Sequence, residues 1–162
     1  MLKIIVLIAA PFLSVTAAFA SQDAAPSFKR GGIKVEAPWL RATPKGAQVA
    51  GAYMTISNTG TTQDRLVGGS LDRAERFEVH EMTIVDDVMR MRPLTNGPEI
   101  KPGETIELKP GGYHVMGLEL QGGYTQGQTV KGTLRFENAG TLDIEYAVGP
   151  VGGGAPGMSH AN

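Results

Sequence analysis

Residues 76–94 read RFEVHEMTIVDDVMRMRPL and carry the signature of a β-hairpin. Two runs of strand-forming residues flank a central Val-Asp-Asp-Val, and a short polar break of this kind predicts two antiparallel strands joined by a two-residue turn. If the two aspartates form the turn, positions whose numbers sum to 173 lie opposite one another, which sets Met82 across from Met91. His80 is then diagonal to Met91 and within reach of its long side chain.

The rest of the chain also consists of strand-forming runs separated by turn-forming residues. Short runs rich in Val, Ile, Tyr and Thr alternate with clusters of Gly, Pro, Asn and Asp, and no segment shows a long helical period. This pattern predicts an all-β domain of about nine strands in a Greek-key sandwich or barrel. The expected strands cover residues 33–37, 48–57, 64–69, 76–84, 88–94, 104–108, 113–120, 129–137 and 141–148.

The first twenty residues are typical of a secretory signal. Lys3 precedes an apolar run, and small residues lead up to Ala20 in an A-x-A pattern. A membrane anchor is the competing interpretation, but Pro11 and Ser14 interrupt the run, and a span needs about 18 uninterrupted apolar residues. We therefore expect a signal peptide over residues 1–20, cleaved after Ala20, and an exported protein without stable membrane insertion.

The expected mature chain of 142 residues is long enough for one domain with its own core. We assign residues 21–32 to a flexible leader and residues 33–148 to the β-sandwich domain. Residues 149–162 read GPVGGGAPGMSHAN and are too rich in Gly to pack. We therefore expect a flexible tail that carries a methionine and a histidine.

Composition excludes several classes of function. Without residues 1–20 the net charge is −2, which does not favour a nucleic-acid partner. The chain has no cysteine, which excludes disulfides, a catalytic thiol, a cysteine-linked lipid and the His-His-Cys site of blue copper proteins. It also has no G-x-S-x-G motif and no histidine near a candidate nucleophile. We therefore expect a protein that is not an enzyme.

The chain has only three histidines, and each stands two positions from a methionine. Alternate residues of a strand point to one face, so a histidine and a methionine at this spacing share a face. Thioether sulfur is soft and favours Cu(I), imidazole also binds copper, and two of each can complete a four-coordinate site. Zinc would instead draw cysteine, histidine or carboxylate ligands. The pairs are His80 with Met82, His114 with Met116 and, on the tail, His160 with Met158.

A purely structural interpretation stays open at this point, because methionine in a strand is most often core filler. The alternation of the hairpin is also ambiguous. If Phe77 and Val79 face the core, His80 lies outside. If Arg90 and Arg92 face the solvent, the methionines that alternate with them lie inside. A site at the end of the sandwich, where the strands leave the core, would reconcile the two assignments.

The segments VHEMTIVDDVMRMRPL and IKPGETIELKPGGYHVMGLEL resemble the periplasmic copper chaperones of the PCu(A)C family. The pattern of that family is a histidine, ten residues, a methionine, about 21 residues and then H-x-M. Here His80 is followed after ten residues by Met91, and HVM supplies His114 and Met116. The second interval is 22 residues, and we expect the additional residue in the turn TNGPE. The similarity runs from APWLRATP to IEYAV and covers most of the expected domain.

The resemblance implies a cupredoxin-like β-sandwich that binds Cu(I) in the periplasm and delivers it for assembly of the CuA centre of cytochrome c oxidase. It implies as partner the copper-bearing subunit of that oxidase or another copper chaperone. Two alternative functions remain open. The protein is either a periplasmic protein that scavenges copper or confers copper tolerance, or a metal-free β-sandwich scaffold module.

The resemblance also implies the metal ligands. The tail pair looks similar to the Met- and His-bearing extensions of some family members, and it either holds a second copper ion or belongs to an inert terminus. The implied ligands are His80, Met91, His114 and Met116, with Met82 and Met89 as neighbours or substitutes and Met158 and His160 on the tail.

Overall fold

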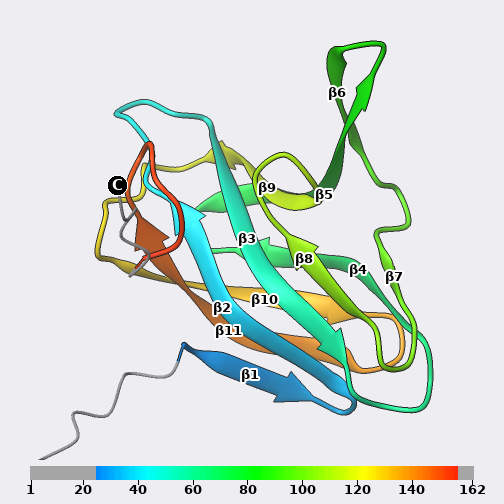
Figure 1. The fold of residues 1–162 in the computed structure, drawn as a ribbon. Coiled ribbons are helices and arrows are strands. Elements are labelled where there is room, and N and C mark those ends of the chain that lie inside the picture. The colour runs from blue at the N-terminus through cyan, green and yellow to red at the C-terminus, as the bar shows by residue number, and fades with distance from the viewer. Residues whose placement is uncertain (1–24, 157–162) are drawn as a thin grey trace, which may run out of the picture.

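The computed structural model describes residues 25–156, and within that range the chain forms strands, turns and loops without a helix. The all-β fold class predicted from the sequence is therefore confirmed. Figure 1 shows the arrangement of the strands. They are β1 (Ser27–Arg30), β2 (Ile33–Arg41), β3 (Val49–Asn58), β4 (Asp64–Leu71), β5 (Ala74–Val85), β6 (Val88–Pro93), β7 (Glu99–Ile100), β8 (Thr105–Leu108), β9 (His114–Leu120), β10 (Thr129–Phe136) and β11 (Gly140–Gly149).

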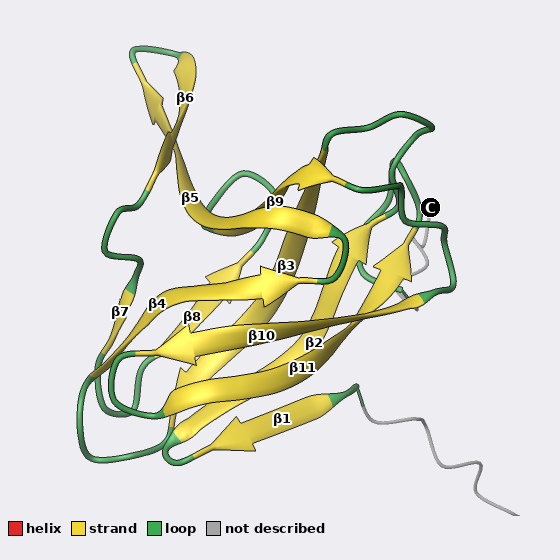
Figure 2. Cartoon of the chain, turned by 180° about the vertical axis from the view of Figure 1, so that it is seen from behind, coloured by secondary structure: helices red, strands yellow, loops and turns green. Residues whose placement is uncertain are grey.

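The strands form one hydrogen-bonded path in the order β6-β5-β9-β3-β2-β11-β10-β4-β7, with β1 joined to β2 and β8 joined to β3. Among the strands of residues 25–156, β11 and β2 pair in parallel and the other pairs are antiparallel. The path curves back on itself, so that β4 contacts β5 and two layers face each other (Figure 2).

The core lies between the two layers and is built by the period-2 alternation of the strands. In β11, Leu142, Ile144 and Tyr146 are buried, whereas the residues between them are exposed. Each fully buried apolar side chain of this kind contributes roughly 1.5–3 kcal/mol relative to an exposed one. Val79 of β5 and Val115 of β9 belong to the same core, which fixes the inward face of those two strands.

The β5–β6 hairpin has the predicted turn and register. Val85 pairs with Val88, and Met82 pairs with Met91. Asp86 and Asp87 occupy the turn with φ of 52° and 60°, the left-handed backbone that a two-residue hairpin of type I′ needs at both central positions.

The hairpin leaves the sandwich, and this resolves the ambiguous alternation. We call residues 82–91 the arm; it projects away from the two layers (Figure 1). Met91 pairs with Met82 and therefore lies on the same outer face as His80. It is not buried, because all six residues of β6 are exposed. The expected placement at the end of the sandwich therefore accounts for both halves of the hairpin.

Two short strands were not predicted. Residues 27–30, which we assigned to the flexible leader, pair with β2 as β1, and Phe28 packs against the core. Glu99 and Ile100 form β7 within a stretch that has the composition of a turn, and the burial of Ile100 explains why this stretch pairs with β4. Strand pairing thus begins before residue 33, at Ser27.

Several predictions concern residues outside the described range of 25–156. They are the signal peptide of residues 1–20 with its cleavage after Ala20, the first part of the leader, and the tail pair Met158 and His160. The first part of the expected tail, up to residue 156, is described. Within it, the Gly153 carbonyl accepts a hydrogen bond from Arg41 Nη2 at 3.5 Å.

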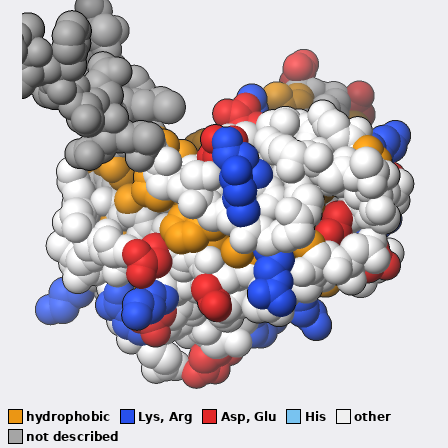
Figure 3. All heavy atoms as spheres, turned by 90° about the horizontal axis from the view of Figure 1, so that it is seen from below, with side chains coloured by type: hydrophobic (Ala, Val, Ile, Leu, Met, Phe, Trp, Pro, Cys, Tyr) orange, Lys and Arg blue, Asp and Glu red, His pale blue; other side chains and the backbone are white. Residues whose placement is uncertain are grey.

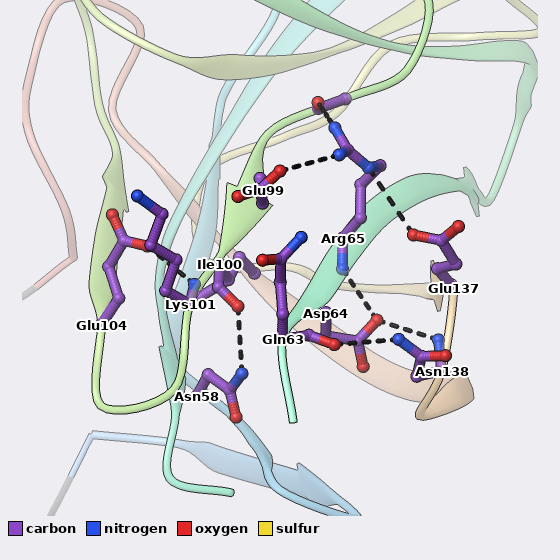
Figure 4. A network of polar contacts seen from close by, with 11 residues as sticks. Asn58, Gln63, Asp64, Arg65, Glu99, Ile100, Lys101, Glu104, Glu137 and Asn138 are labelled. Atoms are coloured by element: carbon purple, nitrogen blue, oxygen red, sulfur yellow. Dashed lines mark hydrogen bonds and ion pairs between the residues drawn. The ribbon is translucent and has the colours of Figure 1, made fainter. Parts of the chain in front are cut away.

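A polar network ties the ends of β4, β7 and β10 together (Figure 4). The buried Asp64 carboxylate accepts hydrogen bonds of 2.7–2.9 Å from the backbone N–H groups of Arg65, Asn138 and Ala139. The Arg65 guanidinium bridges Glu99 at 2.9 Å and Glu137 at 3.6 Å. These partners satisfy the polar atoms that the loops would otherwise bury unpaired.

Candidate metal centre

His80 of β5 and His114 of β9 are direct neighbours across the sheet. The two residues are Cα partners in the β5–β9 ladder, and their imidazole rings lie with centroids 5.8 Å apart and planes inclined by 46°. His80 is 9% exposed and His114 is 5% exposed, although both lie on the face of their strands that points away from Val79 and Val115. The fold therefore brings the two predicted imidazoles together.

Each imidazole has one nitrogen engaged by the protein. His114 Nδ1 lies 2.9 Å from the Gly112 carbonyl oxygen, which can only accept, so Nδ1 carries the proton and Nε2 keeps a lone pair. His80 Nε2 lies 2.8 Å from Glu78 Oε2, and the carboxylate oxygen accepts a hydrogen bond from the Nε2–H group. The remaining nitrogen of His80, Nδ1, is buried and has no hydrogen-bond partner.

The separation of the rings suits a shared metal ion. A metal at about 2 Å from an imidazole nitrogen lies about 3 Å from the ring centroid, so two imidazoles on one ion have centroids up to about 6 Å apart. The observed 5.8 Å is within this range. An unpartnered buried nitrogen is costly unless something binds it, and a metal ion would remove that cost.

Three thioethers lie on the same face as the two imidazoles. Met116 is two residues from His114, is partly buried, and pairs with Glu78 on one side and Gly51 on the other. Met82 is two residues from His80 and is also partly buried. Met91 is the Cα partner of Met82, diagonal to His80 as the hairpin register predicts, and it is 51% exposed.

Met89 lies farther from the histidines than the other methionines of the arm. It pairs with Ile84, one step nearer the turn than Met91, and it is 64% exposed. Because Met89 lies nearer the turn, it is at the edge of the group formed by the two histidines and the other methionines. The face thus combines His80, His114, Met82, Met91 and Met116, with Met89 beyond them.

Oxygen donors do not complete this cluster. Within residues 25–156, no three His, Asp or Glu side chains are arranged to hold a metal ion. Any ion bound between the two histidines would take its further ligands from the neighbouring methionines. Such a ligand set is soft and uncharged, and it favours Cu(I) over zinc, calcium or magnesium.

Aromatic side chains border the site on the β3 side. Tyr53 packs against Trp39 with ring centroids 4.5 Å apart and ring planes inclined by 37°, and both residues are less than a tenth exposed. The Tyr53 hydroxyl lies over Gly51, where an added methyl carbon would be only 2.7 Å from that oxygen. Gly51 therefore leaves room for the hydroxyl beside Met116, its Cα partner.

The opposite face of the arm's base is polar. The Glu81 carboxylate accepts two hydrogen bonds from Arg92, at 3.0 Å from Nε and 2.7 Å from Nη2. Partial burial raises the pKa of Tyr113, and the nearby negative charge of Glu81 raises it further. These groups anchor the base of the arm without taking part in the metal-binding face.

Within residues 25–156, the other surface features do not gather a second set of metal-binding side chains. A groove of about 710 Å³ lies over β1, β4, β10 and β11, and its lining includes none of the predicted ligands. The face at the far end from the arm carries acidic and basic side chains around an apolar strip, and no histidine is visible on it (Figure 3). No helix within residues 25–156 has the length and apolar character needed to cross a membrane.

Glu78 was missed by the sequence analysis. Its position two residues before His80 places it on the same face of β5, and this spacing is the signal that could have identified it. The Gly112 carbonyl, which orients His114, had no comparable signal because any residue supplies a backbone carbonyl.

Comparison with known proteins places the domain in a family. The family model described as "LpqE-like: Putative lipoprotein LpqE-like" matches residues 33–148. The relative named "Putative lipoprotein Lxx21020", from Leifsonia xyli subsp. xyli (strain CTCB07), is 28% identical over 123 residues, which cover 76% of this chain and 73% of the relative.

Solved structures show the same fold. The copper-bound PCuAC domain from PmoF2 is 28% identical to this chain, with a TM-score of 0.67 over 77% of this chain and 98% of that domain. The solution structure of CuI-DR1885 from Deinococcus radiodurans is 27% identical, with a TM-score of 0.54 over 80% of this chain and 83% of that protein. The chain therefore has the cupredoxin-like β-sandwich of PCuAC domains, as the sequence resemblance implied.

Proposed function

The chain belongs to the LpqE-like family, and on that premise we propose that it is a metallochaperone that binds one Cu(I) ion between His80 and His114. Met116 and Met91 complete the shell, with Met82 and Met89 as neighbours or substitutes. The protein carries copper as cargo and catalyses no reaction of its own.

One observation carries this proposal: the two buried imidazoles lie 5.8 Å apart on a face that also presents thioethers. The buried Nδ1 of His80 has no partner within the protein. Soft sulfur and imidazole ligands select Cu(I). The copper-bound and CuI-bound states named for the two solved relatives support the same cargo.

The exposure of the arm favours delivery over permanent storage. Met91 is half exposed, so a partner protein can approach this thioether while the imidazoles still hold the ion. Neutral thioethers also bind copper less tightly than thiolates would, which makes release to a second site easier. We propose that copper passes through Met91 to the partner during transfer.

We further propose that the protein acts in the periplasm after removal of residues 1–20, and that it supplies copper for the CuA centre of cytochrome c oxidase. Its partner is the copper-bearing subunit of that oxidase or another copper chaperone. The tail residues Met158 and His160 capture a second copper ion.

The proposal is tested by anaerobic titration of the protein with Cu(I) against a chromophoric Cu(I) chelator. We expect one tightly bound ion that is lost when His80 and His114 are both replaced by alanine. A metal-free scaffold would leave all the copper on the chelator. Transfer of copper from the loaded protein to a purified copper-binding fragment of the oxidase separates delivery from scavenging, since a scavenger would retain its ion.

A further inference from the structure

We propose that Glu78 is a positioning residue for copper, which holds His80 in the tautomer that presents Nδ1, while His114 presents Nε2 to the same ion. This inference rests on the proposed function and names a residue that the family pattern of histidines and methionines does not include. It predicts that the two imidazoles bind through different ring nitrogens.

The contact that carries the inference is the short hydrogen bond between His80 Nε2 and Glu78 Oε2, at 2.8 Å. An ionised carboxylate accepts and cannot donate, so the bond places the imidazole proton on Nε2. The lone pair of the neutral ring is then on Nδ1. That atom is buried and has no hydrogen-bond partner, so it is available to an ion in the site.

Glu78 is itself held in place. Arg76 Nη1 lies 3.3 Å from Glu78 Oε1, and the same guanidinium lies 2.9 Å from Glu119 through Nε. Arg76, Glu78 and His80 are alternate residues of β5, so all three point to one face. Since Glu78 Oε1 contacts Arg76, Glu78 Oε2 remains directed at His80.

The position of Glu78 in the sheet also places its charge at the site. Its Cα partner across the sheet is Met116, one of the proposed ligands. A site of imidazoles and thioethers is neutral and takes on a positive charge when Cu(I) binds. The carboxylate offsets that charge while its contact with His80 Nε2 orients the ring, as carboxylates behind metal-bound histidines commonly do.

The two histidines differ in what orients them, and this makes the inference testable. His114 is oriented by a backbone carbonyl, which no side-chain substitution removes. His80 is oriented by a side chain that can be replaced without touching any proposed ligand. Removal of such a partner typically weakens metal binding by roughly 10- to 100-fold.

The experiment compares Glu78→Ala, Glu78→Gln and a control, Glu75→Ala, in the full chain. Glu75 lies on the same strand, but its carboxylate accepts from Gln121, away from the histidines. Cu(I) affinity is measured by competition with bicinchoninate. The His80 tautomer is read in the metal-free protein from the nitrogen chemical shifts of the ring in long-range ¹H–¹⁵N spectra.

We expect Glu78→Ala to lower Cu(I) affinity by roughly 10- to 100-fold and to mix the tautomers of His80. Glu78→Gln should lie between this variant and the wild type, because its amide oxygen still accepts from Nε2 but carries no charge. Glu75→Ala should match the wild type in both measurements.

Wild-type affinity in Glu78→Ala, or a His80 proton on Nδ1 in the wild-type protein, would overturn the inference and leave the proposed function intact. The converse failure is distinguishable. If the wild-type chain takes no Cu(I) from bicinchoninate, the proposed function fails, whereas the metal-free spectra still report whether Glu78 sets the tautomer. If Glu78→Ala fails to fold, Glu78→Gln provides both measurements.

Discussion

Replacing His114 with alanine should remove most of the stabilisation that copper confers on the fold. At a Cu(I) concentration a thousandfold above its dissociation constant, one bound ion stabilises the native state by about 4 kcal/mol. For a domain of this size, that raises Tm on the order of ten degrees. The rings of His80 and His114 lie 5.8 Å apart, and if they share the ion as proposed, losing either one removes the gain.

The substitution also has a copper-free cost that must be separated from the loss of binding. His114 is 5% exposed and donates to the Gly112 carbonyl at 2.9 Å. Loss of that hydrogen bond and of the packed ring should cost about 1–3 kcal/mol in the absence of metal. The informative quantity is therefore the Tm difference between the copper-loaded and the metal-free state of each variant.

The assay is anaerobic thermal unfolding followed by circular dichroism, with and without Cu(I), for His80→Ala, His114→Ala and the double variant. Sharing of one ion predicts that the copper-dependent shift is nearly abolished in each single variant and that the double variant loses no more. His160→Ala, the control, should keep most of the shift. If each single variant kept about half of the shift and only the double variant lost it all, the histidines would bind separate ions.

Three further predictions follow from the same structure. Met91→Leu and Met116→Leu should each weaken Cu(I) binding in chelator competition, while Met54→Leu, a change in the core where Met54 is 3% exposed, should leave the affinity unchanged. Equal affinities in all three variants would contradict the assignment of thioether ligands. The fold should lose stability as the pH rises from 10 toward 12, because burial disfavours the phenolate and raises the pKa of Tyr124 to about 12. The loss is at most about 3 kcal/mol, and urea unfolding at pH 9 and pH 11.5 would measure it; a Tyr124→Phe variant should show a smaller pH dependence. Gly69→Ala should destabilise the protein by about 1–3 kcal/mol, since a methyl group there would collide with the Thr133 carbonyl and the Phe77 ring; an unchanged urea midpoint would show that β4 has more room than the structure indicates.

The hairpin that carries half of the candidate site could be predicted in detail. The Val-Asp-Asp-Val turn determines the pairing of every residue from Met82 to Met91, because strand register follows from the turn. The pairing of His80 with His114 could not be derived in this way, because the two residues lie on strands joined by a long connection. The spacing of the family pattern indicated that these residues converge, and the register of β5 and β9 confirms it.

The parts of the fold that escaped prediction have local causes. β1 pairs through a short polar segment in which Phe28 alone packs on the core, and β7 has two residues, too few for any alternation to be recognised. Glu78 was overlooked because a carboxylate on an outer strand face is ordinary. Its importance arises from its contact with His80, which depends on side-chain conformation and not on residue type.

X-ray absorption at the copper edge, on Cu(I)-loaded protein in which Met158 and His160 have been replaced, tests the shared site most directly. The ion between the two imidazoles should show two nitrogen neighbours and two sulfur neighbours in a single shell. A spectrum with nitrogen and oxygen neighbours but no sulfur, or with a single nitrogen, would contradict the convergence of both histidines and the methionines on one ion.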